Sequence, residues 1–147
     1  MTMTNRLFNS PYEMQLRLSL LLSRISFPIS LDKLVALDFI TVYGAEFNVS
    51  AENLHGDSMF RFSEIASKRE QAQEAIRRMA KMGIIEIQIT NGYEYSLSSA
   101  GKKYANSFEG LYASQYRKNA EKAVKEYSQY SDQELMKMIQ NKSMEGR

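Results

Sequence analysis

The sequence predicts a mainly α-helical fold that contains one small β-hairpin. Three observations support this prediction: two apolar helical segments near the N-terminus, a helix–corner–helix segment followed by two alternating apolar stretches, and a long C-terminal segment with helical spacing. The order helix, corner, helix, two-stranded ribbon is that of a winged helix-turn-helix. We therefore expect such a core, with two helices before it and a long helix after it.

The first helix is predicted from its start signals. Ser10 can cap the helix, Pro11 suits the first helical position, and Glu13 stands where a capping box requires a carboxylate. Apolar residues then recur at helical spacing as far as Phe27-Pro28, which should end the helix because the residue before a proline avoids helical geometry.

The second helix should begin after Ser30 and is apolar almost all round, which indicates a buried helix. Gly44 is expected to end it in a left-handed conformation. Residues 45–62 have no sustained period and are expected to form a loop.

The helix–corner–helix segment is predicted from the stretch that follows this loop. Ser63 should cap a short helix that runs to about Lys68, and a second helix should run from about Glu70 to Met82, closed by Gly83. We expect its core to be formed by Ile65, Ala72, Ile76, Met79 and the isoleucine face of the ribbon.

The register of the hairpin follows from its alternating pattern. A two-residue turn would place the apolar side chains of the two strands on opposite faces. A three-residue loop, Thr90 to Gly92, pairs Ile89 with Tyr93 and Ile87 with Tyr95, and so gathers them on one face. Gly92 then takes the left-handed position that such a loop requires.

The C-terminal part is predicted to be helical. A long helix should run from about Ala100 to Tyr127, with Gly110 as a weak point, and a capping box at Ser131 and Glu134 should open a last helix. We expect one domain over residues 1–140, made of N-terminal helices (10–44), a loop (45–62), the helix-turn-helix with its hairpin (63–98) and C-terminal helices (99–140), followed by a flexible tail (141–147).

Composition excludes several classes of protein. The 147 residues include 44% apolar and 24% charged side chains, which is typical of a folded domain. The chain has no cysteine, so it has no disulfide or thiolate site. It begins without a secretory signal, and its apolar stretches are shorter than the roughly 20 residues of a membrane span. We expect a cytoplasmic protein that does not enter a membrane.

An enzyme is not expected from these residues. The single histidine, His55, stands near Asp57, but a metal or catalytic site needs three or four converging groups, and the sequence offers neither a second histidine nor a cysteine. No phosphate-binding loop or nucleophile motif is present. The sequence therefore predicts no catalytic residue, no metal and no cofactor.

DNA binding is one remaining hypothesis. The second helix of the corner would present cations to the major groove, with Lys68, Arg69, Arg77, Arg78 and Lys81 as the candidate contacts. Two carboxylates, Glu70 and Glu74, share this face and would be repelled by phosphates, and the tip of the hairpin is uncharged. A solvated helix face explains the pattern at least as well.

Protein binding is the other hypothesis. Nine tyrosines and nine methionines are many for a small core, and both residue types are favoured at interfaces. The candidate interface consists of the loop around the histidine and the tyrosines of the C-terminal helix, namely His55, Asp57, Tyr112, Tyr116 and Tyr127. Binding of a foreign partner and homodimerisation through this helix both remain open.

Four stretches resemble a known family. "SPYEMQLRLSLLLS", "LDKLVALDFITVYG", "NLHGDSMFRFSEIASKRE" and "NGYEYSLSSAGKKYANSFEGLYASQYR" together are similar to the small middle component of bacterial ABC-three-component conflict systems. That group overlaps the Lamassu-type anti-phage and anti-plasmid defence operons. The similarity extends from about Tyr12 to Tyr116.

The resemblance implies a non-catalytic winged-helix subunit that works with an SMC-like ABC ATPase and an effector, often a nuclease. The middle component would bridge the ATPase and the effector and assist DNA engagement through the complex. The alternative is a stand-alone winged-helix DNA-binding regulator of transcription.

Overall fold

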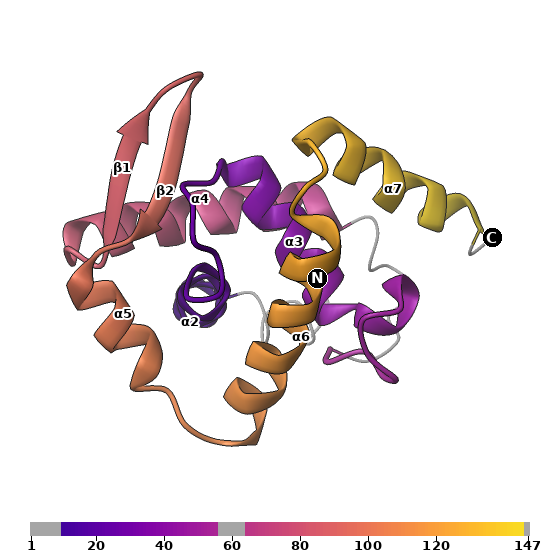
Figure 1. Ribbon diagram of the computed structural model, residues 1–147, viewed down its shortest axis with the longest axis horizontal. Coiled ribbons are helices and arrows are strands. Elements are labelled where there is room, and N and C mark those ends of the chain that lie inside the picture. Colours follow the sequence, from indigo (N-terminus) through magenta and orange to yellow (C-terminus); the bar gives the residue numbers. More distant parts are fainter. Residues whose placement is uncertain (1–9, 56–63, 146–147) are drawn as a thin grey trace.

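The computed structural model describes residues 10–55 and 64–145. Within those ranges the chain forms six α-helices, a short 3-10 helix and one two-stranded antiparallel hairpin, which confirms the predicted fold class (Figure 1). The elements are α2 (Pro11–Leu22), α3 (Leu31–Val42), η1 (Gly44–Phe47), α4 (Ile65–Lys81), β1 (Ile85–Ile89), β2 (Tyr93–Leu97), α5 (Ser99–Asn106), α6 (Leu111–Tyr127) and α7 (Asp132–Glu145).

The N-terminal caps lie where the sequence predicts them. Ser10 Oγ accepts a hydrogen bond from the amide of Glu13, and Ser30 Oγ accepts one from the amide of Lys33, each at 3.2 Å. Helix α2 ends at Leu22, earlier than expected, because the following amides bond three residues back in a tighter turn.

The end of α3 differs from the prediction. The left-handed residue in this region is Asn48, with φ of 60°, whereas Gly44 begins the 3-10 helix. Gly44 is needed there for a different reason, since a Cβ atom at this position would collide with the side chain of Ser50.

The predicted corner at residue 69 is wrong, because α4 is one continuous helix of 17 residues. An unbroken helix places Lys68, Ala72, Ala75, Ile76 and Met79 on one face, and all five are buried. A corner would have split this face, and no residue between 65 and 81 opposes helix formation. The helix closes as predicted at Gly83, with φ of 74°; the predicted cap at Ser63 lies outside the described residues.

The arrangement remains compatible with a winged helix, but the helices that precede the hairpin are not the two that the sequence predicted. Here α2, α3 and α4 precede the hairpin, and one residue of the link between α2 and α3 forms an isolated bridge to β2. Ile29 exchanges two backbone hydrogen bonds with Tyr95 on β2, at 3.0 and 2.8 Å. The sequence carries no signal for this bridge, because a single paired residue leaves no periodic pattern.

The hairpin has the predicted register. Ile89 lies opposite Tyr93 and Ile87 opposite Tyr95, and Gly92 has a φ of 111°. The expectation that the isoleucine face joins the core is wrong for the tip. Ile85 is buried, but Ile87 is 50% exposed and Ile89 is 72% exposed, because the ribbon projects from the body beyond α4 (Figure 1).

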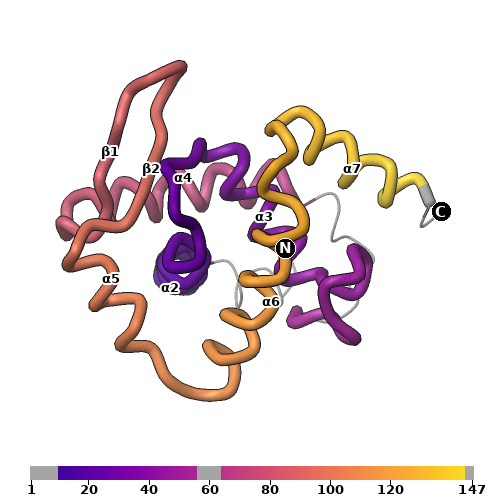
Figure 2. The backbone as a smooth tube through the Cα atoms, viewed as in Figure 1, coloured from indigo at the N-terminus to yellow at the C-terminus, as the bar shows by residue number. Residues whose placement is uncertain are grey.

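The predicted long C-terminal helix is broken into α5 and α6. Gly110, with φ of 108°, begins the second segment and lets the chain turn back, as Figure 2 shows. The break allows α5 to pack against α2 while α6 packs against α3. The guanidinium of Arg117 donates to the carbonyl oxygens of Ala105 and Phe108, at 2.9 and 2.6 Å, and so fastens the turn.

The last helix has the predicted start. The amide of Glu134 donates to Ser131 Oγ at 3.1 Å, and the amide of Ser131 donates to the carboxylate of Glu134 at 2.9 Å, which completes the capping box.

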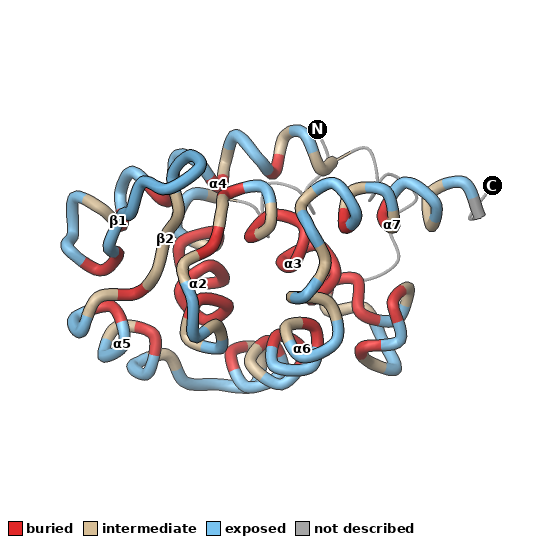
Figure 3. Tube along the Cα trace, turned by 45° about the horizontal axis from the view of Figure 1, so that its top comes forward, coloured by how far each residue is buried: buried red, intermediate tan, exposed pale blue. Residues whose placement is uncertain are grey.

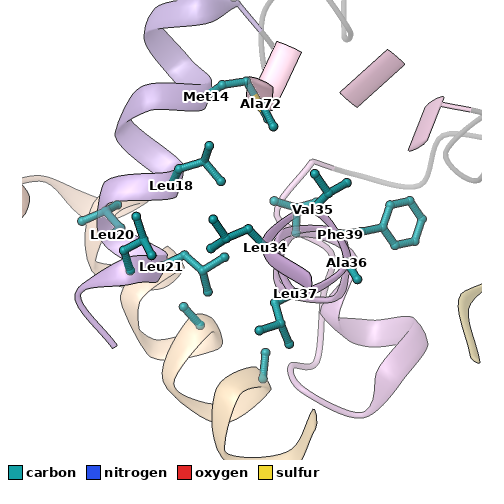
Figure 4. Close-up of a cluster of buried hydrophobic side chains, with 14 of the residues drawn as sticks. Met14, Leu18, Leu20, Leu21, Leu34, Val35, Ala36, Leu37, Phe39 and Ala72 are labelled. Atoms are coloured by element: carbon teal, nitrogen blue, oxygen red, sulfur yellow. The ribbon is translucent and has the colours of Figure 1, made fainter. Parts of the chain in front are cut away.

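The core lies between α2 and α3, which the other helices surround. Figure 3 shows both helices buried along most of their length, and Figure 4 shows Leu18, Leu21 and Leu34 in the space between them, with Leu37 on the neighbouring side of α3. All four side chains have no exposed surface. Burying a leucine side chain fully contributes roughly 1.5–3 kcal/mol, so this layer is a main source of stability.

We predict that Gly101→Ala destabilises the protein by about 1–3 kcal/mol, because an added Cβ atom would collide with the carbonyl oxygen of Ile84 and force α5 away from the hairpin. Urea denaturation measures the change. Lys103→Ala, at an exposed position of the same helix, is the control and should change the free energy of unfolding by less than about 0.5 kcal/mol. Equal midpoints for Gly101→Ala and the parent chain would contradict the prediction.

Candidate functional site

A carboxylate with no exposed surface, that of Asp38, lies in the middle of α3. Arg17 on α2 binds it with two hydrogen bonds, from Nε to Oδ1 at 3.0 Å and from Nη2 to Oδ2 at 2.8 Å. The hydroxyl of Tyr116 on α6 donates to Oδ1 at 2.7 Å. Three helices are therefore joined at one acidic side chain, which we call the charged centre.

Helix α4 adds a second cation to the charged centre. Lys68 Nζ lies 3.7 Å from Asp38 Oδ2, which makes an ion pair beyond hydrogen-bonding distance. The ammonium group also lies 5.1 Å from the ring centres of both Phe39 and Tyr43, in favourable cation–π positions. No hydrogen bond satisfies it within the described part of the chain.

The pKa values show which charges the centre keeps. Burial alone would raise the pKa of Asp38, but the cations of Arg17 and Lys68 hold it far below its usual range. Burial lowers the pKa of Lys68 to about 8, although Asp38 partly opposes this change. Burial raises the pKa of Tyr116 well above its usual value, so its hydroxyl stays a donor. The centre is thus a fixed ionic link.

His55 lies beside the charged centre. Its Nε2 atom is 2.8 Å from the hydroxyl of Tyr112, and the two rings are stacked with centres 6.1 Å apart. The ring of Tyr43 meets His55 edge-on at 6.2 Å. Burial lowers the pKa of His55 to about 2, so the imidazole is neutral at physiological pH. Asp57, its predicted companion, lies outside the described residues.

The structure places the candidate interface residues mostly inside the fold. Tyr116 has no exposed surface, His55 is buried, and Tyr112 is only partly exposed. The hydroxyl of Tyr127 donates to the carbonyl oxygen of Phe47 at 2.8 Å. These side chains hold α6 to the body, and their surface role stays a prediction only for the exposed parts of Tyr112 and Tyr127.

Sequence reasoning missed Arg17 and Asp38 as a pair. A signal for them was present, because each is a charged residue among buried apolar neighbours of its own helix. Such residues are almost never fully buried unless they are paired. The pairing partner, however, depends on how α2 crosses α3.

The candidate nucleic-acid contacts divide into three kinds. Lys68 points inward and is buried. Two exposed cations are paired: Arg69 with Asp32 at 2.6 Å, and Arg77 with Glu74 at 3.4 Å. Arg78 and Lys81 are exposed and have no ion pair in the described part of the chain. DNA contact by the exposed residues stays a prediction.

A groove of about 900 Å³ lies between residues 49–54 and the outward face of α6. It is polar and has mixed charge, with Glu52, Lys118, Glu121, Lys122 and Lys125 among its lining residues. Its two walls are the segment that leads to His55 and helix α6, but His55, Tyr112, Tyr116 and Tyr127 of the predicted interface do not line it.

Within the described ranges, no group of three or more His, Cys, Asp or Glu residues is placed to hold a metal ion. In the same ranges, no helix is both long and apolar enough to cross a bilayer.

These features define a small helical protein with a projecting hairpin, whose arrangement is compatible with a winged helix and whose charged centre links its helices. The family model of ABC-three component (ABC-3C) system Middle Component 2 matches residues 7–146. The chain therefore belongs to this family of middle components, which confirms the predicted resemblance, and its partners are other components of such a system. No curated protein and no solved structure matches the chain.

We predict that Asp38→Asn lowers the free energy of unfolding by roughly 3–5 kcal/mol, because it leaves two buried cations without their counter-charge. Lys68→Met should cost less than about 1 kcal/mol, since the ammonium group has no hydrogen bond and methionine fills a similar volume. Chemical denaturation of both variants tests the contrast. Equal losses would show that Lys68, and not only Arg17, is required to balance Asp38.

We predict that stability falls as the pH is lowered from 7 to 5. His55 is neutral in the folded protein down to about pH 2, while in the unfolded chain it gains a proton near its ordinary pKa of 6.5. The unfolded state thus binds more protons below pH 6.5, which costs about 2 kcal/mol of stability at pH 5.

The His55→Gln variant should show a flatter pH dependence over this range, because glutamine keeps a polar partner for Tyr112 and does not titrate. Denaturation midpoints at pH 7, 6 and 5 measure the difference. Parallel curves for the two proteins would assign the acid sensitivity to other groups.

Proposed function

We propose that this chain is a non-catalytic adaptor in an anti-phage or anti-plasmid defence complex of the Lamassu type. It links an SMC-like ABC ATPase to an effector, often a nuclease, and assists DNA engagement through the complex. The observation that carries the proposal is the family match along residues 7–146. The family model covers nearly the whole chain, so we assign the role of the whole chain to the assembly of that system.

The charged centre supports an adaptor role because it makes the helical body rigid. Residues from α2, α3, α4 and α6 meet at Asp38. Removing the shared carboxylate of such a buried network is costly, so the helices that meet at Asp38 keep fixed relative positions. A subunit that bridges two larger components needs surfaces held at a fixed separation.

The groove between residues 49–54 and α6 is the docking surface that we assign to the ATPase. Its exposed lysines, Lys118 and Lys122, are one helical turn apart on α6 and point to the same side. Their charge suits an acidic segment of the partner. Glu121 and Glu126 lie on the same wall, so the site selects a mixed-charge partner surface and not a polyanion.

A stand-alone DNA-binding regulator is the alternative. The exposed Arg78 and Lys81 on α4 favour it, since in a winged-helix arrangement this helix would face the major groove. Against it, Arg69 and Arg77 are already paired with carboxylates, and Glu70 is exposed on the same helix. Unopposed cations are too few for strong phosphate binding.

We predict that co-expression with the ABC ATPase of its own system yields a complex that survives size-exclusion chromatography. Changing both Lys118 and Lys122 to Glu should weaken this complex roughly tenfold or more, equivalent to about 1.4 kcal/mol, by reversing the charge of the groove. The control is a charge reversal at Lys102 and Lys103, which are exposed on α5. The melting temperature of each variant verifies that the fold is intact.

Two results would contradict the proposal. No complex with the ATPase at any salt concentration would remove the adaptor role. Tight, site-specific binding of the isolated chain to one duplex, abolished by changing Arg77 and Arg78, would favour the regulator instead.

A further inference from the structure

The outer edge of β1 is unpaired in the described part of the chain. β1 bonds only to β2 across the hairpin, whereas the outer edge of β2 is occupied by Ile29. Figures 1 and 3 show β1 on the outside of the ribbon, at one end of the molecule. An exposed strand edge with β-branched residues is a template for pairing with another strand.

The direction of the free backbone groups can be derived from the known bonds. Tyr95 uses its amide and carbonyl for Ile29, on the side away from β1. Its opposite residue, Ile87, therefore belongs to a pair that is not hydrogen-bonded, and its own amide and carbonyl point to the free edge. Because the pattern alternates, the same holds for Ile89, while Glu86 and Gln88 bond to β2.

The exposed apolar side chains of β1 belong to these same two residues, Ile87 and Ile89. Ile87 and Ile89 lie on one face together with Tyr93, which is 62% exposed. The opposite face is polar, with Gln88 directly across from Glu94. Ile85 would be the third edge residue, but it is buried at the base of the hairpin, so the accessible part of the edge is its outer half.

We propose that two copies of this chain pair through the edges of β1, antiparallel and with the two Gln88 residues opposite each other on the two-fold axis. Ile87 of each copy then exchanges both backbone hydrogen bonds with Ile89 of the other. The two hairpins form one continuous four-stranded sheet.

Charge and burial select this register. Moving the axis toward the base, to Glu86, would place two carboxylates directly opposite each other, which is destabilising. An axis at Ile87 would require the buried Ile85 to pair. With the axis at Gln88, the polar row reads Glu94, Gln88, Gln88, Glu94, so that the amide groups stand between the two carboxylates.

A second copy fits this edge because the strand is complementary to itself. In the chosen register, the apolar row reads Tyr93, Ile89, Ile87, Tyr95 across the two copies, and a second identical row is generated by the two-fold axis. The exposed isoleucines thereby gain cross-strand partners. Because Ile29 already pairs with Tyr95 at the centre of the other edge of the sheet, that edge is blocked there, and pairing stops at a dimer and does not continue into a fibre.

The test is sedimentation velocity of the full-length chain over a dilution series, with variants at Gln88. The parent chain should form a discrete dimer. Gln88→Glu should weaken the dimer by on the order of tenfold or more, because four carboxylates then share one row. Mixing equal amounts of Gln88→Glu and Gln88→Lys should restore it, since the two opposite charges meet on the axis.

The same pair of substitutions at Gln73, an exposed residue of α4, is the control and should leave the dimer unchanged. Amide hydrogen exchange gives a second readout. The amides of Ile87 and Ile89 should become protected as concentration rises, whereas those of Glu86 and Gln88 should be protected at every concentration.

Three outcomes would overturn the proposal. The chain could remain monomeric throughout the dilution series. A dimer could form that neither weakens with Gln88→Glu nor recovers on mixing, which would place the interface elsewhere. The Ile87 and Ile89 amides could be protected only when a different component of the system is added, which would identify a foreign strand as the occupant.

Discussion

A carboxylate buried without exposed surface must keep its counter-charges in place, and this requirement organises the protein around Asp38. Arg17 approaches it from α2, Lys68 from α4 and Tyr116 from α6. Apolar packing brings the helices together, but it tolerates small shifts; the bidentate contact with arginine does not. Once packing has brought α2 and α3 together, this ionic link restricts how the two helices can shift against each other.

Lys68 is the member of the charged centre whose burial is least well compensated. Its ammonium group is buried, lacks a hydrogen bond in the described residues and is held by two aromatic rings and a longer ion pair. Burial lowers its pKa, as expected where the charged form is poorly solvated. The cation nevertheless joins α4 to α3, beside the buried apolar face of α4.

The tyrosines illustrate how composition misleads about surfaces. Nine tyrosines suggested an aromatic interface, but the hydroxyl groups of those on α6 mostly form hydrogen bonds with groups inside the fold. Tyr116 satisfies Asp38, Tyr112 meets His55, and Tyr127 satisfies the backbone of η1. Three of the exposed large apolar residues, Ile87, Ile89 and Tyr93, lie instead together on one face of the hairpin. Aromatic residues with a polar group are favoured at interfaces, and they are equally suited to interiors that contain charged groups.

Local signals in the sequence determined the elements. The caps at Ser10, Ser30 and Ser131 and the three-residue hairpin loop follow from short-range hydrogen bonding and backbone preference, and all lie as predicted. Tertiary packing decided the rest. It kept α4 continuous because one face of that helix is buried, it broke the C-terminal helix so that two halves could cover different neighbours, and it paired Arg17 with Asp38. These outcomes depend on which faces meet in space, and contacts between residues far apart in the chain leave no period in its sequence.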